Sequence, residues 1–329
     1  MNTKARRKLP AFVGPLMAII ILAVVLSLTT DRFLTVDNLM NILKQTSVNA
    51  LIASGMLMVM LTGGIDLSVG SVAILSGCVM GVLMKAGVQS DIILLLAGLG
   101  TGLLAGLING LMFTELELPH PFVSTMGSRM IFRGLALIIT GAAPISGFSK
   151  GVRFFGNANL FKIMPVCFLL VIAFYAVYYV FLEKTALGRK IYSVGGNKEA
   201  ARLSGINVKR TLNFTYMMCG LMAAVAGIVI VGRISVAHPA ASETADMDAI
   251  AACVVGGTSF LGGKGTIVGV LSGALLIGVI SNGLDLLGAQ TDIKYLATGM
   301  LIILSVFLDV FRIKAEERAR MLEQAKALA

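Results

Sequence analysis

Apolar runs follow one another along nearly the whole chain, from residue 11 to residue 310, and this feature limits the fold more than any other. A helix needs about 20 apolar residues to cross the hydrocarbon core of a bilayer. The composition agrees, because 57% of the residues are hydrophobic and 13% are charged, whereas soluble domains average about 25% charged residues. The sequence therefore predicts an all-α polytopic membrane protein with about ten transmembrane helices.

The candidate spans are apolar runs joined by polar connections. They cover residues 11–29, 47–62, 67–85, 92–113, 122–141, 163–182, 211–232, 246–261, 265–284 and 294–311. The runs at 47–62 and 246–261 are short, so the count ranges from about eight to about eleven. We expect a single transmembrane domain over residues 1–329, with polar segments at 1–10, 183–210 and 312–329.

Basic residues set the expected orientation. The formal net charge is +10 at pH 7, and lysine and arginine gather on the cytoplasmic side of membrane proteins. Basic clusters lie in the three polar segments, and ten spans would place all three on one side. We therefore expect both termini and residues 183–210 in the cytoplasm, lipid around the spans and no nucleic-acid partner. The expected outside segment departs from the rule, because it contains Lys150, Arg153 and Lys162.

The sequence gives no sign of a metal site, a bound cofactor or a disulfide. Neither a C-x-x-C pair nor an H-E-x-x-H motif occurs, and the chain has two histidines. All the cysteines fall inside apolar runs, where they are typical of small buried side chains; they are Cys78, Cys167, Cys219 and Cys253. The first apolar run is expected to be retained as a span, because Thr29-Thr30-Asp31 lacks a signal-peptide cleavage pattern.

One apolar run carries glycine at every fourth position, at Gly98, Gly102, Gly106 and Gly110. Such a stripe lies on one face of a helix and lets another backbone approach closely. Helix packing within the bundle is one interpretation, and a smooth face beside a polar solute path is the other.

A polar segment interrupts the apolar pattern at Gly63-Gly64-Ile65-Asp66-Leu67-Ser68-Val69-Gly70-Ser71. Irregular backbone at membrane depth needs protein or water around it. A carboxylate there is a candidate for function, so Asp66, Ser68 and Ser71 are candidate residues of a translocation pathway. The alternative is a tight turn in which Asp66 or Ser68 caps the helix that begins near Val69.

Asp66 also has a candidate cation in the fifth run. Arg129 and Arg133 lie four residues apart and share a helix face. The expected topology puts the start of this run and the Asp66 turn on the same side. This placement predicts an intramembrane ion pair between Asp66 and Arg133.

Three asparagines in or beside the spans complete the pathway candidates: Asn49, Asn109 and Asn282. Buried amides require hydrogen-bond partners. Bonds between helices would satisfy them, and so would a hydroxylated solute, since amides both donate and accept hydrogen bonds.

A glycine-rich segment at residues 256–265 resembles a phosphate-binding loop at first sight. It fails the Walker template, because Thr258 stands where a glycine is needed and Lys264 is followed by glycine rather than Ser or Thr. We expect a cytoplasmic turn between two spans.

The long basic segment 183–210 separates two spans. Gly195-Gly196-Asn197 is expected to be a turn, and residues 198–203 a short helix that ends with a cap at Gly205. A short charged helix between two spans is suited to docking a soluble partner, although a solvated connector would show the same composition.

Several long motifs, in order, resemble the permease subunits of bacterial ABC importers for simple sugars, the ribose-type group. They are NILKQTSVNALIASGM (41–56), LTGGIDLSVGS (61–71), ALGRKIYSVGGNKEAARLSGINVKR (186–210), DAIAACVVGGTSFLGGKGTIVG (248–269) and SNGLDLLG (281–288). Glu199-Ala200-Ala201 with Gly205 is similar to the EAA-type coupling motif of importers, but the Ile-x-Leu-Pro that often follows is missing.

The resemblance implies a non-catalytic pore subunit in the bacterial inner membrane. Its implied partners are a cytoplasmic ATPase that uses ATP and magnesium, a periplasmic sugar-binding protein and a second permease copy. The implied ATPase-coupling residues are Gly188, Gly195, Gly196, Asn197, Glu199, Ala200, Ala201 and Gly205.

The main rival is an ion-coupled secondary transporter. Such proteins often carry several intramembrane acids or histidines, whereas Asp66 is the one obvious acid near membrane depth in the sequence. An intramembrane enzyme would need a metal or nucleophile constellation, and a purely structural protein would not need the segment 183–210.

Overall fold

The structure is a computed structural model. It describes residues 12–116, 118, 120–160, 164–241, 244–290, 292–304, 306–307, 310–311 and 321. The polar segment 1–10 and all but one residue of the polar segment 312–329 lie outside the described residues.

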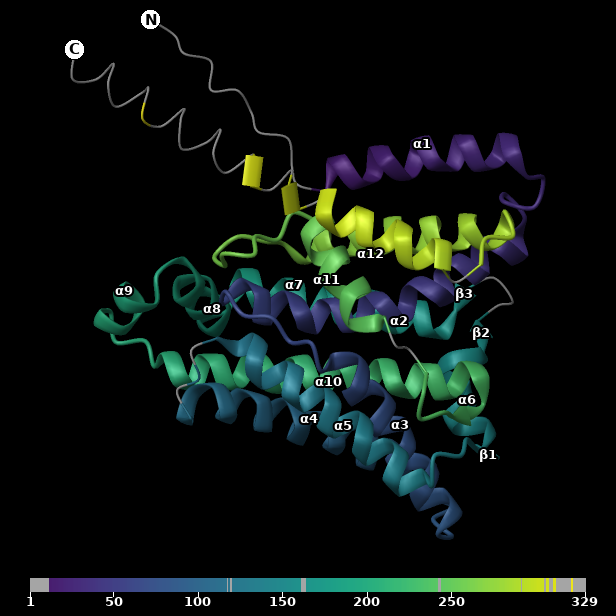
Figure 1. Ribbon diagram of the computed structural model, residues 1–329, viewed down its shortest axis with the longest axis horizontal. Coiled ribbons are helices and arrows are strands. Elements are labelled where there is room, and N and C mark those ends of the chain that lie inside the picture. The colour runs from purple at the N-terminus through teal and green to yellow at the C-terminus, as the bar shows by residue number, and fades with distance from the viewer. Residues whose placement is uncertain are drawn as a thin grey trace, which may run out of the picture.

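The described chain is mainly helical (Figure 1). Its helices are α1 (Val13–Thr29), α2 (Val36–Leu61), α3 (Val69–Lys85), α4 (Asp91–Glu115), α5 (Pro121–Thr140), α6 (Lys150–Asn157), α7 (Val166–Lys184), α8 (Ala186–Gly196), α9 (Lys198–Leu203), α10 (Val208–Ile234), α11 (Ala245–Val255) and α12 (Ile267–Leu286). Residues 292–304 are helical as well. The short strands are β1 (Ile145–Ser146), β2 (Asn159–Leu160), β3 (Met164–Pro165) and β4 (Val236–Ala237).

Among the described residues, six helices are long and apolar enough to cross a membrane by length and composition: α2, α4, α5, α7, α10 and α12. Helices α1 and α3 are apolar but shorter, with 17 residues each. The expected span 246–261 corresponds to α11, which has only 11 residues and is followed by a loop. The fold is therefore a polytopic helical bundle that combines long helices with shorter buried ones.

Helix α2 begins well before the expected start at residue 47. The Thr35 side chain accepts a hydrogen bond from the Asn38 backbone N–H, which fixes the first turn at Val36. Polar residues in the first turns, among them Asn38 and Gln45, hid this part of the helix from a search for apolar runs.

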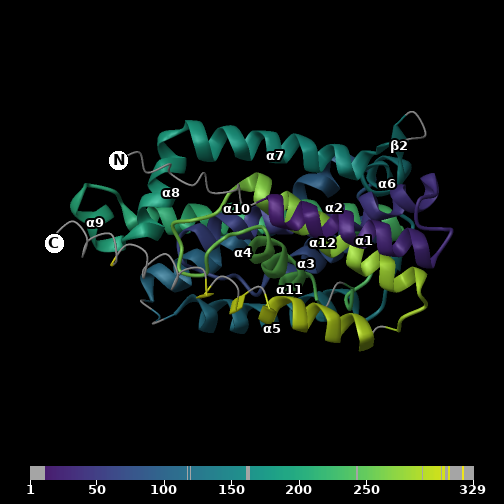
Figure 2. The same cartoon turned by 90° about the horizontal axis from the view of Figure 1, so that it is seen from above.

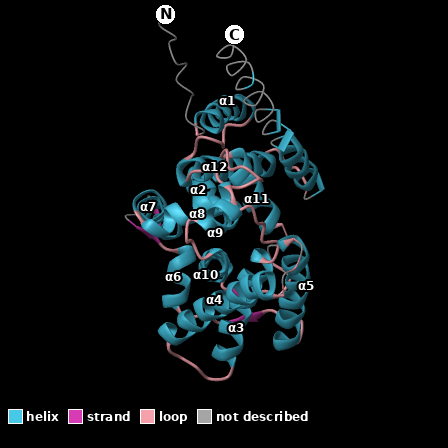
Figure 3. Ribbon diagram, turned by 90° about the vertical axis from the view of Figure 1, so that its left-hand side faces the viewer, coloured by secondary structure: helices cyan, strands magenta, loops and turns pink. Residues whose placement is uncertain are grey.

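Helices α2 and α10 form the centre of the bundle, and about three-quarters of the most apolar window of each is buried. They pack against each other and share one large core with residues of α3, α7, α11 and α12. Figures 2 and 3 show α7 along one side of this centre and α5 along the other. The outer helices α4, α5 and α7 are much less buried, as expected for helices that face lipid or another chain.

The two ends of the bundle differ. Helices α8 and α9 lie at one end, which we call the α8–α9 end (left in Figure 1). Helix α6 and the two strand pairs lie at the opposite end, where β1 pairs antiparallel with β4 and β2 with β3. Helices α2, α10 and α12 run along the axis between these ends.

The glycine stripe of α4 packs against α10. A side chain at Gly102 would meet the Gly220 carbonyl oxygen and the Ala224 side chain, and one at Gly106 would meet the Tyr216 carbonyl oxygen. Gly220 in turn faces Gly102, so the two backbones are in direct contact. The stripe therefore serves helix packing, the first of the two interpretations.

Replacing Gly102 with valine is expected to lower the free energy of unfolding by about 3 kcal/mol, the upper end of the cost of overpacking. The matched control is Gly100→Val in the same helix, where a new side chain has open space. The measurement is unfolding of both purified variants in mixed micelles. Equal losses would mean that the intrinsic helix propensity of valine, rather than the α4–α10 contact, determines the effect.

Candidate functional site

Helix α8 forms most of the segment expected to carry the coupling residues. Thr185 caps its start by accepting a hydrogen bond from the Gly188 N–H at 3.1 Å. Gly188 has no room for a side chain, because the carbonyl oxygens of Phe181 and Leu182 lie against it. Gly195 and Gly196 close the last turn of this helix. The turn expected at Gly195-Gly196-Asn197 is therefore shorter than predicted, because Gly195 and Gly196 belong to an 11-residue helix. The chain changes direction at Asn197, which has an extended backbone.

Helix α9 confirms the short helix expected at residues 198–203 and the glycine cap after it. The Asn197 side chain accepts from the Ala200 N–H at 2.9 Å and starts the helix. Gly205 has a φ of 80°, and the Ile206 N–H bonds to the Ala201 carbonyl oxygen, so the helix ends in a glycine-type cap.

The two faces of α9 differ. Ala201 is buried against Val194 and Leu212, whereas Glu199, Ala200 and Leu203 are exposed. Glu199 accepts two hydrogen bonds from Arg202, and these bonds lower the pKa of the Glu199 carboxyl. The exposed face therefore carries an ionised Glu–Arg pair next to an apolar side chain.

Main-chain contacts join α8 to two distant loops. The Gly263 N–H donates to the Leu61 carbonyl oxygen at 2.9 Å, and a side chain at Gly195 would collide with both of these groups. The Tyr192 hydroxyl donates to the Gly265 carbonyl oxygen at 2.9 Å, and burial raises the pKa of this phenol to about 12. The end of α2 at Leu61 and loop 256–265 therefore touch α8, and Gly63 of loop 62–68 touches Leu261 of loop 256–265. We call this set of contacts the loop junction.

Helix α9 is also tied to α4 and α10. The Lys198 ammonium lies 5.6 Å from the centre of the Phe113 ring of α4, and Ala201 packs with Leu212 of α10. A separate pair joins α10 to α4, because Lys209 Nζ lies 3.1 Å from Glu115 Oε2. A movement of α9 would therefore be transmitted to the ends of α4 and α10 as well as to the loop junction.

A buried polar cluster surrounds Asp66 beneath the loop junction. The Asp66 Oδ1 atom accepts hydrogen bonds from the Ser68 N–H at 2.9 Å and from the Ser68 hydroxyl at 2.7 Å. The Asn109 amide lies 3.4 Å from each carboxylate oxygen and donates to the Ser68 hydroxyl at 2.7 Å. All three side chains are at most 1% exposed. The cluster fixes the start of α3 against α4. Ser68 is the N-cap residue of α3, but its side chain makes no capping hydrogen bond, and the Asp66 carboxylate instead closes a turn just before the helix.

The structure corrects the expected Asp66–Arg133 ion pair. Within the described residues, the groups that contact the Asp66 carboxylate come from Ser68 and Asn109. Among the described residues, Asp246 is an acid that meets this face of α5, and its Oδ2 atom lies 2.9 Å from Arg129 Nη1. The reason is that the Asp66 turn faces α4, whereas α11 presents Asp246 to α5. Sequence reasoning missed Asp246, and the one available signal was an acid at the start of a weak apolar run.

The remaining pathway candidates fall in different places. Ser71 is buried in the first turn of α3. Asn282 exchanges hydrogen bonds with Asn38 at 2.9 and 3.0 Å, which links α12 to α2. Asn49 lies at the wall of a cavity. The structure thus brings Asp66, Ser68 and Asn109 together and leaves the other three apart.

A bundle of this kind, with long apolar helices and polar groups buried inside, belongs to the class of multi-pass membrane proteins. Residues 38–306 match the family model described as "Branched-chain amino acid transport system / permease component". No solved structure is significantly similar to the chain.

Three relatives are similar over most of their length. The ribose import permease protein of Bacillus subtilis (strain 168) is 40% identical over 298 residues, which is 90% of this chain and 92% of the relative. The ribose import permease protein of Escherichia coli (strain K12) is also 40% identical, over 89% of this chain and 92% of the relative. The D-allose transport system permease protein of the same strain is 41% identical, over 88% of each chain.

The chain therefore belongs to the permease family of bacterial ABC importers for simple sugars, the ribose-type group. It is a multi-pass protein of the inner membrane.

Replacing Gly195 with alanine is expected to open the loop junction, because a methyl group there collides with main-chain atoms that cannot rotate away. The measurement is the rate of trypsin cleavage within residues 183–210 of the intact protein. Each 1.4 kcal/mol of local destabilisation speeds cleavage through the opened state about tenfold. Gly196→Ala is the matched control, since that position has open space. Equal cleavage rates in the two variants would contradict the role assigned to the junction.

Replacing Asp246 with asparagine is expected to lower the free energy of unfolding by about 3 kcal/mol, because it removes the buried negative charge that contacts the partly buried Arg129 guanidinium. The control, Asp285→Asn, breaks the more exposed pair with Lys294 and is expected to cost about 0–1 kcal/mol. Unfolding in mixed micelles measures both. A cost for Asp246→Asn as small as that of the control would contradict the importance of the Arg129 pair.

Proposed function

We propose that this chain is the transmembrane subunit of an ATP-driven importer that translocates a simple sugar across the bacterial inner membrane. The observation that carries the proposal is the exposed helix α9, which follows α8 and is joined through it to the loop junction, in a chain of this family. Relatives named for ribose, allose and fructose import support a pentose or hexose as the solute.

The exposed face of α9 has the chemistry of a docking surface. Leu203 is 78% exposed on α9, and Leu261 is 75% exposed on the neighbouring loop 256–265. Apolar side chains ringed by charges such as Glu199 and Arg202 are typical of protein interfaces. We assign this face to a cytoplasmic ATPase, which binds and hydrolyses ATP with magnesium, so the permease itself needs no cofactor.

The proposed topology follows from this assignment. The α8–α9 end, both termini and the loops 62–68 and 256–265 face the cytoplasm, and the chain crosses the membrane about ten times. The opposite end, with α6 and the strand pairs, faces the periplasm and receives a sugar-binding protein. A second permease copy, identical or closely related, completes the pore.

The loop junction suggests how a movement of the ATPase is transmitted to the membrane-spanning helices. Loop 62–68 leads into α3, and loop 256–265 leads into α12. A displacement of α9 therefore reaches the start of both helices through the main-chain contacts at Gly195. Rocking of these helices would alternate access between the two sides, as in hinge and shear transitions of other proteins.

The test is ATP-driven uptake of labelled sugar by proteoliposomes that contain the permease, its ATPase and a sugar-loaded binding protein. Glu199→Arg is expected to lower sugar-stimulated ATP hydrolysis at least about tenfold, which corresponds to about 1.4 kcal/mol of lost docking free energy. Gly205→Pro is expected to act in the same direction, because it disrupts the cap of α9.

The matched control is Asp31→Arg, an acid-to-arginine change at an exposed residue between α1 and α2, at the opposite end. It is expected to leave co-purification of the ATPase with the permease unchanged, whereas Glu199→Arg is expected to weaken it. Uptake that follows an ion gradient without any ATPase would overturn the proposal and support the secondary-transporter reading.

A further inference from the structure

A polar cavity of about 400 Å³ lies between α11, α12 and residues 294–301, and a second one of about 420 Å³ adjoins it beside α2. The two share Thr244, Asp248, Ser281 and Lys294, so they form one continuous recess, which we call the α2–α12 cavity. Its volume is in the range of small-molecule sites, about 300–1,000 Å³. The predicted coupling residues and the Asp66 cluster do not line it.

The cavity lies in the half of the bundle away from α8 and α9. Asn49 is 12 residues before Leu61, and an α-helix rises 1.5 Å per residue, so Asn49 lies about 18 Å along α2 from the loop junction. Ser281 is near the end of α12 that is distant from loop 256–265, and Arg233 is near the end of α10. The recess is therefore placed toward the proposed periplasmic side, where a solute would arrive.

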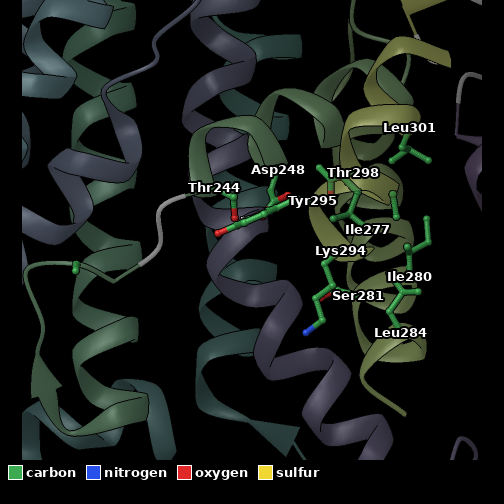
Figure 4. A pocket seen from close by; sticks show the side chains of 12 residues that line it. Thr244, Asp248, Ile277, Ile280, Ser281, Leu284, Lys294, Tyr295, Thr298 and Leu301 are labelled. Carbon is green, nitrogen blue, oxygen red and sulfur yellow. Dashed lines mark hydrogen bonds between the residues drawn. The ribbon is translucent and has the colours of Figure 1, made fainter. Parts of the chain in front are cut away.

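The wall of the cavity combines hydrogen-bonding groups with apolar surface. Figure 4 shows the side chain of Tyr295 reaching toward Thr244 and Asp248, while Ile280 and Ser281 approach from α12. A monosaccharide has the matching surface, since its hydroxyl groups need donors and acceptors and its C–H face packs on aromatic or aliphatic side chains.

Unpartnered amide atoms mark the α2 side of the recess. The Asn49 side-chain nitrogen and oxygen and the Gln45 Oε1 atom are buried and have no hydrogen-bond partner among the described residues. Leaving such groups unsatisfied costs about 1–3 kcal/mol each. A solute with several hydroxyl groups would satisfy them after a small side-chain rotation, and an apolar solute would not.

The charges at the cavity favour a neutral ligand. Among the described lining residues, two acids, Asp248 and Asp285, are balanced by two bases, Lys294 and Arg233. Lys294 pairs with Asp285, Arg233 donates to the Lys44 carbonyl oxygen, and Asp248 accepts from the Thr244 hydroxyl. The charges of the described lining residues therefore sum to zero.

From these observations we propose that the α2–α12 cavity is a monosaccharide-binding site inside each permease chain, on the side where the solute enters. The proposal rests on the proposed function, because it takes the solute to be a simple sugar. Asn49 and Asp248 hydrogen-bond the hydroxyl groups, and Tyr295 packs on the C–H face of the sugar ring. The chain then takes part in solute recognition as well as forming the pore.

The test is protection of a cysteine introduced at Ser281. The four native cysteines are buried, so a membrane-impermeant maleimide should label Ser281→Cys preferentially in the full-length permease assembled with its ATPase. D-ribose, D-allose, D-fructose and D-galactose are tested singly, and L-leucine serves as a solute without hydroxyl groups on its side chain. We expect at least one of the sugars to slow labelling several-fold and leucine to have no effect.

Asn49→Leu and the nearly isosteric Asp248→Asn, each in the Ser281→Cys background, are expected to abolish protection. Asn159→Leu, at an exposed residue outside the cavity, should retain it. Absence of protection by any sugar, protection by leucine, or protection that survives both cavity variants would overturn the site. Sugar uptake measured in parallel separates the two hypotheses: ATP-driven uptake without protection rejects this site alone, whereas failure of ATP-driven uptake rejects the importer function.

Discussion

Hydrocarbon offers no water to a polar group, and the buried part of this structure depends on that constraint. At three places inside the bundle, polar side chains from different helices meet one another. Asp66 and Ser68 meet Asn109 of α4, Asp246 meets Arg129 of α5, and Asn38 meets Asn282 of α12. Because an unpaired partner would be costly in this medium, these three contacts define which helices are neighbours more strictly than the non-directional packing of leucine and valine does.

Small residues stabilise the bundle in a second way, because they let helix backbones approach closely. Where α4 crosses α10, and where α8 meets the two loops, main chain lies against main chain without side chains between. Contacts of this type gain dispersion energy over many atoms and leave little freedom for sliding. The close packing of α4 on α10 makes this part of the bundle rigid. The contact between α8 and the two loops, in comparison, is made by a few backbone groups around Gly195.

The sequence predicted the class of fold well, because length and hydropathy are sufficient to find most long helices, and the short helix at 198–203 followed from its cap residues. It predicted helix boundaries less well. Asn38 and Gln45 interrupt the apolar signal of α2 although both belong to the helix, and α11 is a short buried helix that hydropathy extends into a full span.

For the site residues too, the sequence identified candidates but did not predict which of them meet. Asp66, Ser68 and Asn109 were each recognised as candidates, and their meeting was not predicted, since 43 positions separate Asp66 from Asn109. The ion pair was assigned to Arg133 and Asp66, and the structure gives Arg129 and Asp246. Nothing in a single sequence reports which of two buried acids faces a given helix, because this depends on how α11 is placed in the bundle.

The contrast between the two sides of the α8–α9 unit has a consequence for how such transporters diversify. Inward contacts at Gly195 are made by backbone atoms, whereas the outward face of α9 consists of side chains such as Glu199 and Leu203. In the proposed importer, recognition of the ATPase and transmission of its movement are therefore encoded in different atoms. One permease interior can remain unchanged while the outward side chains are exchanged, so that a new motor subunit is adopted without rebuilding the machinery that it drives.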